Sequence, residues 1–301
     1  MDGVGLPLSA QPFLNDPLLP HLLDIVSDPV SGELILGGGF GIRLKQLEIA
    51  KQGHSTLIAS VPPARATQDF DFFLRIELWV QKERGQSVRA MLDRLGYETH
   101  SRNWQFGKTF APNSPQHRVK VDLLARHPRE GEPVKVKDFR VGSKSGVDLH
   151  GYDTPEAFAV EERPKSLEVS GQRSDTTLVT GVVLVPHPYA SLNMKVKAAH
   201  DWLQMVRGGT KSKPNAEKHV FDVYILVAML LNEEIAECGE LAAHYADHPM
   251  AEENKINAVE LFGSQSGQGF TEILRQIGGL PYDYATFWEG LREALGIIQN
   301  L

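Results

Sequence analysis

The chain has 301 residues, of which 42% are hydrophobic and 23% charged, and its formal net charge is -7. This length suits roughly two domains, and the composition is that of an ordinary globular protein. The negative charge argues against broad binding of duplex DNA, because non-specific affinity comes mainly from Lys and Arg on phosphates.

The sequence also limits where the chain is expected to act. No apolar run approaches the ~20 residues that span a bilayer, and the N-terminus lacks the basic-then-apolar order of a signal peptide. The single cysteine, Cys238, cannot form an internal disulfide, which suits a reducing compartment. We therefore expect a cytoplasmic protein with no membrane partner.

A glycine-rich turn is the first candidate for binding a ligand. Glu33 to Leu36 predicts a short buried strand, and apolar spacing predicts a helix from Ile42 to Ala50 that ends at Gly53. Free N–H groups at a helix N-terminus bind anions, and glycines let a backbone approach a phosphate closely. The turn is neither a Walker A loop nor a GxGxxG fingerprint, so a plain tight turn is the alternative. Its central residues are Gly38, Gly39, Phe40 and Gly41.

Two acids alternate along the next predicted strand, within residues 65–73. In an extended strand Asp69 and Asp71 project to one face, and Phe70 and Phe72 project to the other. Such a pair suits Mg²⁺, which is commonly held by one or two carboxylates together with substrate phosphates. A half-buried edge strand with two solvated acids is the alternative. The strand is expected to continue through residues 76–80, before a helix at 88–95.

A third acid follows on a later strand. Residues 117–124 alternate, with Asp122 on the polar face beside Lys120. A sheet that carries Asp69 and Asp71 could set Asp122 next to them. Three crowded carboxylates repel unless cations neutralise them, and two metal ions would stabilise an in-line displacement at phosphorus. A solvated strand face is again the alternative.

The hydrophobic periodicity changes near residue 188. Residues 126–147 are expected to be loops with at most one strand, and 157–159, 167–169 and 177–185 are strand candidates. His187, between two prolines, is expected to be structural. From Tyr189 onward the period is helical, with further helices at 235–245, 254–262, 271–277 and 284–298. We therefore predict an α+β protein, with a mixed-sheet domain at 1–188 and a helical bundle at 189–301.

A lysine and an acid occupy apolar surroundings in the helical half. Lys195 lies on the apolar stripe of the first helix, and Asp222 is the only acid in the apolar run 220–231. An unpaired buried carboxylate costs several kcal/mol, so Asp222 needs a cation, and Lys195 is the candidate. A purely structural pair between two helices is the alternative. His244 and His248 are expected to be surface residues rather than metal ligands.

In this order, the motifs resemble those of the DNA polymerase β-like nucleotidyltransferase superfamily. More narrowly, residues 38–44 look like the "GGTALAL" segment, and residues 65–72 look like the "R-x-S/T-x-D-I-D-F" segment, of AbiEii-type nucleotidyltransferases. Lys195 is similar to the lysine of that family's "K-L-x-A-L" helix, and Asp222 to the first acid of its "R-D-L-x-D-L" helix. These proteins are toxins of abortive-infection and related toxin–antitoxin systems.

Three positions depart from these motifs. Phe40 stands where the family usually has a small hydroxyl residue, Phe221 replaces an arginine, and Ile225 replaces the second acid. The separation between Gly38 and Asp69 is also longer than usual, which suggests an inserted loop.

The resemblance implies a nucleotidyltransferase that uses an NTP and Mg²⁺ or Mn²⁺. The metal ligands would be Asp69, Asp71 and Asp122, the last of which could instead accept a proton. The glycine turn would cradle the triphosphate, Arg65 and Lys195 would contact the nucleotide, and Asp222 would help to hold the active site.

The acceptor and the partner are left open by the sequence. A tRNA or other RNA end, a protein hydroxyl and a small molecule all fit as acceptors, and a cognate antitoxin is an expected partner. A kinase-like phosphotransferase acting on a protein hydroxyl and a degenerate nucleotide-binding module are the alternatives.

Overall fold

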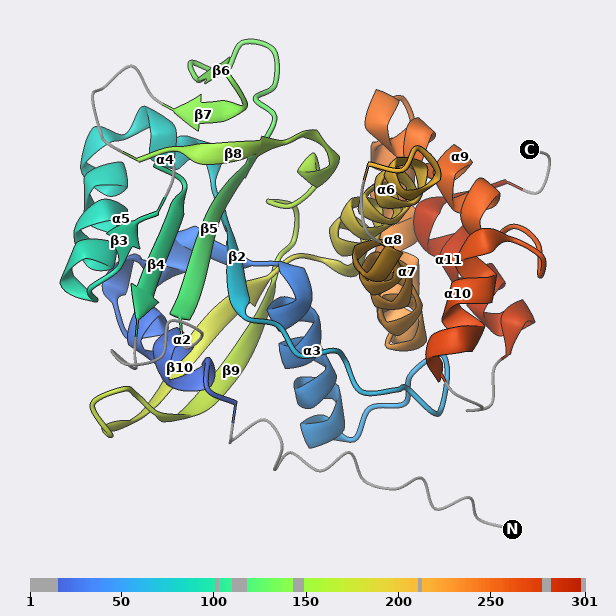
Figure 1. Ribbon diagram of the computed structural model, residues 1–301, viewed down its shortest axis with the longest axis horizontal. Coiled ribbons are helices and arrows are strands. Elements are labelled where there is room, and N and C mark those ends of the chain that lie inside the picture. The colour runs from blue at the N-terminus through green and yellow to red at the C-terminus, as the bar shows by residue number, and fades with distance from the viewer. Residues whose placement is uncertain are drawn as a thin grey trace. The chain divides into compact units, whose positions relative to one another are not determined.

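The computed structural model describes residues 16–100, 103–109, 118–142, 149–210, 213–277 and 283–298. It is mixed α/β and divides into two compact units (Figure 1). The sheet unit holds residues 16–48 and Ala66–Pro186, and the helical unit holds Ile49–Arg65 and the chain from His187 on. The predicted boundary after residue 188 lies two residues from this division. Residues 49–65, however, belong to the helical unit and not to the sheet unit where we expected them.

A large mixed sheet forms the sheet unit. Its strand order is β6-β7-β8-β5-β2-β1-β10-β9, with β4 paired to β5 and β3 to β4. The central strand β2 is antiparallel to β1 and parallel to β5. The strands are β1 (Leu34–Leu36), β2 (Asp69–Leu74), β3 (Glu98–Thr99), β4 (Gln105–Thr109), β5 (Arg118–Arg126), β6 (Lys135–Lys137), β7 (Arg140–Gly142), β8 (Gly151–Thr154), β9 (Lys165–Gln172) and β10 (Leu178–Val185).

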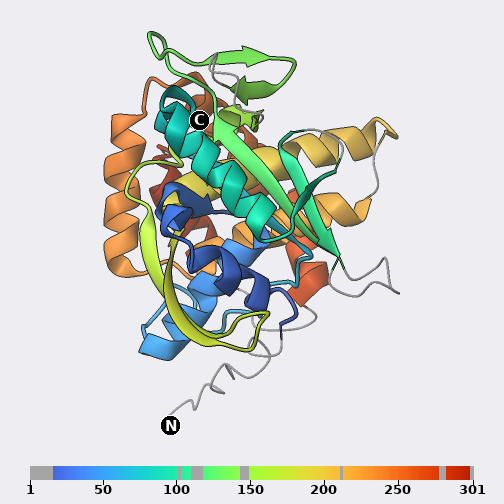
Figure 2. The same ribbon diagram turned by 90° about the vertical axis from the view of Figure 1, so that its left-hand side faces the viewer.

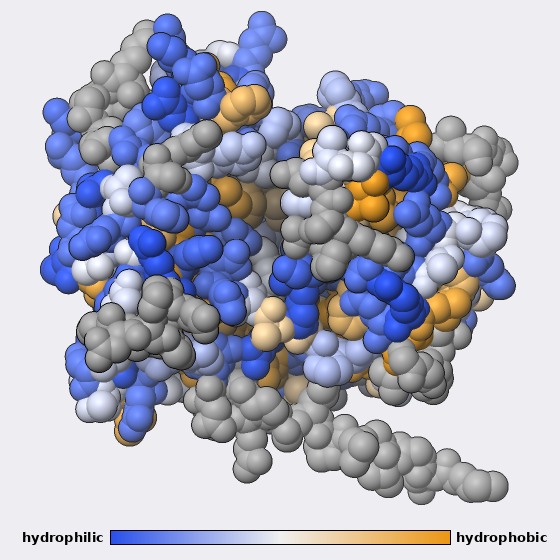
Figure 3. All heavy atoms as spheres, in the orientation of Figure 1, coloured by the Kyte–Doolittle hydropathy of each residue, from blue (hydrophilic) through white to orange (hydrophobic). Residues whose placement is uncertain are grey.

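The alternation predicted for the central strands is confirmed. Phe70 and Phe72 of β2 are 0% and 2% exposed. They share one core with Val121 of β5 and with Val88 and Met91 of helix α5 (Lys82–Arg94). The acids of β2 therefore occupy the face opposite this core. On the side turned to the viewer in Figure 3, hydrophilic side chains cover most of the sheet unit.

Two predicted strands are wrong. Residues Ile76–Val80 form helix α4, whose first N–H, that of Ile76, donates to Oε1 of Glu161 at 2.7 Å. Residues 157–159 begin at the last residue of the short 3₁₀ helix Pro155–Ala157, continue as a turn and are buried in succession, which an alternating strand would not show. In both segments a short apolar run was equally compatible with a buried turn of helix.

Several short strands were not predicted. These are β3, β4 and β8, and the region expected to hold one strand contains both β6 and β7. Strands of two to five residues show too few alternations to be recognised from the sequence. Of the predicted strand 117–124, His117 lies outside the described residues.

The β9–β10 hairpin is anchored to helix α2 (Leu19–Val26). Figure 2 shows the hairpin as a long curved ribbon. The side chain of Asp24, 4% exposed, accepts hydrogen bonds from Nε of Arg173 at 3.2 Å and from Oγ of Ser174 at 2.6 Å. A Cβ on Gly181 would lie 2.7 Å from Cγ2 of Val26, so the helix packs directly on β10.

The helical unit consists mainly of helices, as the sequence predicts. None of the helices in the described residues is long and apolar enough to cross a membrane. The helices not yet introduced are α3 (Gly38–Gln52), α6 (Pro188–Arg207), α7 (Lys213–Ala228), α8 (Asn232–His244), α9 (Pro249–Phe262), α10 (Gln268–Ile277) and α11 (Tyr284–Leu295), together with the 3₁₀ helix η1 (Pro29–Glu33).

Two histidines have structural roles in the helical unit. His187 is fully buried and caps α6, since its Nδ1 accepts from the N–H of Tyr189 at 3.2 Å while Nε2 lies 2.9 Å from Glu237. His248 caps α9 by accepting from the N–H of Met250. His187 thus has the structural role that its neighbouring prolines indicated, whereas His248, expected to be a surface residue, is half-buried, and His244 is exposed as expected.

Replacing Phe40 should destabilise the sheet unit strongly. Its ring is fully buried and meets Phe70 edge-on, with centroids 5.1 Å apart. Truncation to alanine leaves a cavity, so Phe40→Ala should lower the free energy of unfolding by about 3–5 kcal/mol. Phe40→Leu, which keeps most of the volume, should cost under about 1.5 kcal/mol. Urea denaturation measures both variants, and equal costs would contradict the packing described.

Candidate functional site

The register of β2 and β5 brings the predicted acids to one face. In this parallel pair Asp71 lies opposite Asp122, and Asp69 lies opposite Lys120. Residues opposite each other on neighbouring strands project to the same side of a sheet. Asp69, Asp71 and Asp122 therefore share the face that Phe70 and Phe72 do not occupy, and all three acids are half-buried. Asp122 lies beside Asp71, which is the arrangement that the sequence predicts.

The surroundings of Asp122 disfavour its negative charge. Burial raises the pKa of its carboxyl group above the ordinary value, and the negative charge of Asp69 raises it further. A hydrogen bond from the side chain of Gln105, opposite Asp122 on β4, opposes the shift only in part. The hydroxyl of Thr67 donates to Oδ1 of Asp69. The negative charges of Asp69 and Asp122 thus repel each other, and a nearby cation would stabilise both.

The glycine turn is pressed against Asp71. Gly37 donates its N–H to the carbonyl of Asp71 at 2.8 Å. Gly38 has φ +63°, and a Cβ there would overlap Oδ2 of Asp71. Only glycine combines that backbone conformation with this close approach. The carboxylate of Asp71 consequently lies beside the N-terminus of α3.

Helix α3 begins at Gly38, four residues before the predicted start at Ile42. Fewer residues of the glycine turn are therefore available to bind a phosphate. The N–H of Gly41 already donates to the carbonyl of Gly37 at 3.1 Å, inside the first turn. The side chain of Phe40 is in the core, so this residue could reach a phosphate only through its backbone. The first N–H groups of a helix have no acceptor within it. Among the predicted phosphate contacts, Gly38 and Gly39 fit this role best.

The donor set fits a hard divalent cation. Carboxylate oxygens are the ligands that Mg²⁺ prefers, and a cation would offset both causes of the raised pKa of Asp122, which are burial and the charge of Asp69. Within the described part of the chain, however, no three His, Cys, Asp or Glu side chains are already arranged to hold a metal ion. The metal assignment of Asp69, Asp71 and Asp122 stays a prediction.

A second cluster lies in the helical unit. Asp222 of α7, whose side chain is 3% exposed, accepts from Nζ of Lys195 at 2.7 Å, so the predicted ion pair is confirmed. Arg65 adds two parallel hydrogen bonds of 3.1 Å, from Nε to Oδ1 and from Nη2 to Oδ2. The sequence did not predict this third partner, because 157 residues separate Arg65 from Asp222.

The two cations control the charge of this cluster. Burial alone would raise the pKa of Asp222, but the charges of Lys195 and Arg65 outweigh it and hold the pKa below its ordinary value. Burial, with the charge of Lys195, lowers the pKa of His219 to about 3, so that ring is neutral. Two positive charges thus face one negative charge.

Residues 49–65 join the helical unit through main-chain contacts as well. The N–H groups of Leu57 and Ile58 donate to the carbonyls of Leu230 and Ala228, at 2.9 and 3.2 Å. These bonds use carbonyls at and just beyond the C-terminal end of α7. Together with the hydrogen bonds between Arg65 and Asp222, they explain why this segment belongs to the helical unit.

The two residues of α7 that differ from the nucleotidyltransferase motif are packed in the interior. Phe221 is 8% exposed and Ile225 is 1% exposed. Neither apolar side chain could replace the arginine or the acid of the motif. Asp222 is the residue of α7 that matches the motif.

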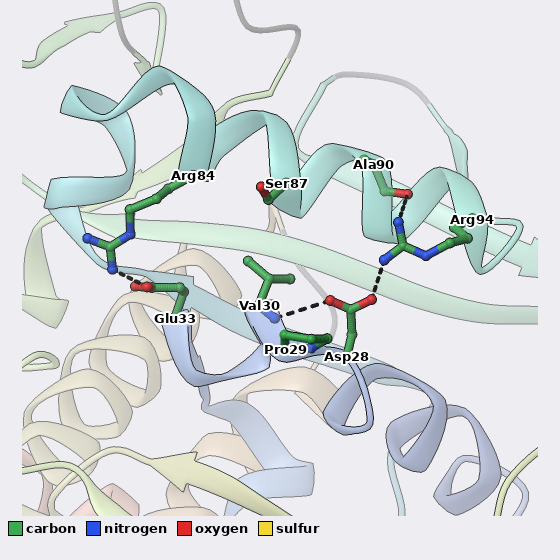
Figure 4. Close-up of a pocket in the computed structure, with 8 residues that line it drawn as sticks. All are labelled: Asp28, Pro29, Val30, Glu33, Arg84, Ser87, Ala90 and Arg94. Carbon is green, nitrogen blue, oxygen red and sulfur yellow. Dashed lines mark hydrogen bonds and ion pairs between the residues drawn. The ribbon is translucent and has the colours of Figure 1, made fainter.

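The sheet unit also has a pocket of about 450 Å³ between η1 and α5 (Figure 4). Its two cations are already neutralised, since Arg84 pairs with Glu33 and Arg94 pairs with Asp28. None of the predicted site residues lines it. We interpret the pocket as part of the packing contact between η1 and α5, which these ion pairs hold together.

Comparison with known proteins adds no relative. No family model matches this chain, and no curated protein gives a significant match. The resemblance to nucleotidyltransferases therefore rests on the motifs and their geometry.

Removing the Asp222 carboxylate should destabilise the protein. Asp222→Ala leaves Arg65 and Lys195 without their shared anion, which should cost about 3–5 kcal/mol at pH 7. Because the folded pKa is depressed, this stabilisation is present above the unfolded pKa of about 4 and is lost as pH falls below it. Denaturation against pH measures both effects. The control is Asp201→Asn, which removes one partner of the half-buried Lys197 while Glu253 remains at 3.2 Å, and should change stability by under about 1 kcal/mol. Equal effects of the two substitutions would contradict this role of Asp222.

Neutralising Asp122 should have the opposite effect. A raised folded pKa penalises folding at pH values above it, and the penalty disappears as pH falls below the unfolded pKa. Asp122→Asn should therefore raise the melting temperature of the metal-free protein at pH 7 and have less effect near pH 4. Thermal melts at the two pH values test this. A lower melting temperature at pH 7 would show that the carboxylate is not strained.

Proposed function

We propose that the chain is a metal-dependent nucleotidyltransferase that moves a nucleoside monophosphate from an NTP to a hydroxyl acceptor. The observation that carries the proposal is the β2–β5 register, with Asp71 opposite Asp122, together with the glycine turn against Asp71. Paired acids and the N–H groups of a helix N-terminus are what phosphoryl chemistry requires: a place for a cation and a place for phosphate oxygens.

Each predicted site residue named below, all in the sheet unit, has a role in this proposal. Asp69 and Asp71 bind Mg²⁺ or Mn²⁺, and the N–H groups of Gly38 and Gly39 donate to phosphate oxygens. The bound ion supplies charge neutralisation for the transferred and departing phosphates. The acceptor oxygen forms a bond to the α-phosphorus, the α–β bridging bond breaks, and pyrophosphate leaves. Asp122, whose pKa is raised, either accepts the hydroxyl proton or binds a second ion.

Lys195 and Arg65 are proposed as nucleotide contacts on the resemblance. Their hydrogen bonds to Asp222 use one of the three N–H donors of Lys195 and two of the five of Arg65. The cluster has one more positive charge than negative, which favours an anion such as a phosphate. Asp222 positions the two cations and does not touch the substrate.

The resemblance extends the proposal to a toxin with a cognate antitoxin. The degenerate binding module is the second candidate, since the side chains of Phe40, Phe221 and Ile225 are buried and cannot serve a nucleotide. The candidates differ in turnover: a module would bind an NTP with Mg²⁺ and transfer nothing.

Substituting the β2 acids should abolish transfer. The protein is incubated with each α-labelled NTP, Mg²⁺ and a total cell extract, and labelled RNA, protein and small molecules are separated. Asp69→Asn and Asp71→Asn should each lower labelling on the order of a hundredfold or more, because several kcal/mol of transition-state charge stabilisation is lost. Glu130→Gln, at an exposed acid of the same unit, should have no effect.

Two outcomes would contradict the proposal. Full labelling by the Asp69→Asn, Asp71→Asn double variant would exclude these acids. Labelling from γ-labelled but not α-labelled NTP would identify phosphate transfer, the kinase-like alternative.

A further inference from the structure

Two exposed aromatic rings lie together at one end of the sheet. Phe139, between β6 and β7, is 65% exposed, and Tyr152 of β8 is 37% exposed. Their rings stack with centroids 6.2 Å apart and an interplanar angle of 22°. The buried ring of Trp104 lies 5.6 Å from that of Tyr152 and supports it. We call Phe139 and Tyr152 the aromatic platform. Figure 1 shows β6, β7 and β8 at this end of the sheet.

The backbone holds Phe139 in an unfavourable conformation. The β6–β7 hairpin turns through Asp138 and Phe139, with φ values of 50° and 60°. Two-residue turns of this kind favour Asn-Gly, and a bulky residue at positive φ is an outlier. The carbonyl of Phe139 accepts from the N–H of Asp153 at 2.9 Å, which ties the turn to β8. A ring that is mostly exposed contributes little to folding, so the strained position suggests a role in binding.

Three cations lie on the two strands next to the platform. Lys135 and Lys137 of β6 are exposed, and neither has an ion-pair partner among the residues that the structure describes. Arg140 of β7 is 41% exposed at its side chain, and Asp138, at 3.4 Å, neutralises part of its charge. This end of the sheet is therefore locally basic, although the chain as a whole is acidic.

The platform and the acids share a face of the sheet. Arg140 lies opposite Tyr152, and Tyr152 lies opposite Leu124, which is two residues after Asp122 on β5. Opposed residues, and residues two apart on a strand, project to the same side. A strand spacing of ~4.8 Å and a rise of ~3.3 Å per residue place the Cα atoms of Tyr152 and Asp122 about 8 Å apart.

We propose that this face binds single-stranded nucleic acid. A base stacks on Phe139 and Tyr152, and the phosphates lie against Lys135, Lys137 and Arg140. Stacking rings combined with nearby cations suit a strand whose bases are unpaired, since a duplex hides its base faces. The further statement that the end of this strand is the acceptor hydroxyl rests on the proposed function. The binding itself does not, because the platform contains none of the proposed catalytic acids.

The test measures binding without NTP or metal. Fluorescence anisotropy follows labelled single strands of roughly ten nucleotides, in RNA and DNA arms, with a duplex of the same sequence as a third arm. Phe139→Ala and Tyr152→Ala should each weaken single-strand binding roughly tenfold, whereas Tyr152→Phe, which retains the ring, should not. Leu178→Ala, which removes a 75% exposed apolar side chain from β10, is the matched control.

The salt dependence tests the cations separately. Changing Lys135 and Lys137 to glutamine should reduce the slope of log affinity against log salt by about 0.7 for each phosphate that is no longer neutralised. Lys82→Gln, at an exposed lysine of α5, should leave the slope unchanged. Tighter binding of the RNA strand than of the DNA strand, or the reverse, would identify the kind of strand that the platform prefers. Either result supports the proposal.

Three results would overturn it: no single-strand binding by the unaltered protein, duplex binding as tight as single-strand binding, or binding that none of the platform variants weakens. These results are distinguishable from failure of the proposed function. A protein that binds strands through the platform but transfers no nucleotide refutes only the enzyme. A protein that transfers nucleotides with undiminished strand binding in Phe139→Ala and Tyr152→Ala refutes only the platform.

Discussion

The repulsion between acids on β2 and β5 is the interaction on which the rest of the proposed site depends. A parallel register places Asp71 opposite Asp122, and burial, followed by the charge of Asp69, keeps the pKa of Asp122 high. Such crowding costs stability unless a cation offsets it. The buried face of the same strands, with Phe70 and Phe72, fixes the register, because a slip of one residue would move the acids into the core. Packing of the core therefore stabilises the β2–β5 register, which the repulsion between the acids opposes.

The sequence predicted features that follow from a strong local pattern or from an unavoidable cost. Alternation on β2 separated acids from phenylalanines, and the cost of burying Asp222 alone predicted its pairing with Lys195. It did not predict contacts set by the tertiary fold. Arg65 reaches Asp222 across 157 residues, and the segment Ile76–Val80 is helical because its apolar run packs as one turn. The platform of Phe139 and Tyr152 was also not predicted, since it depends on pairing among three short strands.

In the structure, some residues of the predicted motifs have other roles than the ones expected for them. The glycine turn contributes close approach and two N–H groups, whereas Phe40 contributes packing and Gly41 is committed to the first turn of α3. In the helical unit, the partly exposed Arg65 and Lys195 hold the buried Asp222 ionised. Such a cluster is weak evidence for stability, which is compatible with the proposed use of the two cations as nucleotide contacts.

The most direct test of the central claim is to count the metal ions that the acids hold. Titration with Mn²⁺ in the presence of an NTP, followed by electron paramagnetic resonance of the free ion, gives the number bound per chain. We predict one or two ions in the unaltered protein, with at least one fewer in Asp71→Asn and the full number in Glu130→Gln. Equal numbers bound by the unaltered protein and Asp71→Asn would contradict the proposed metal site.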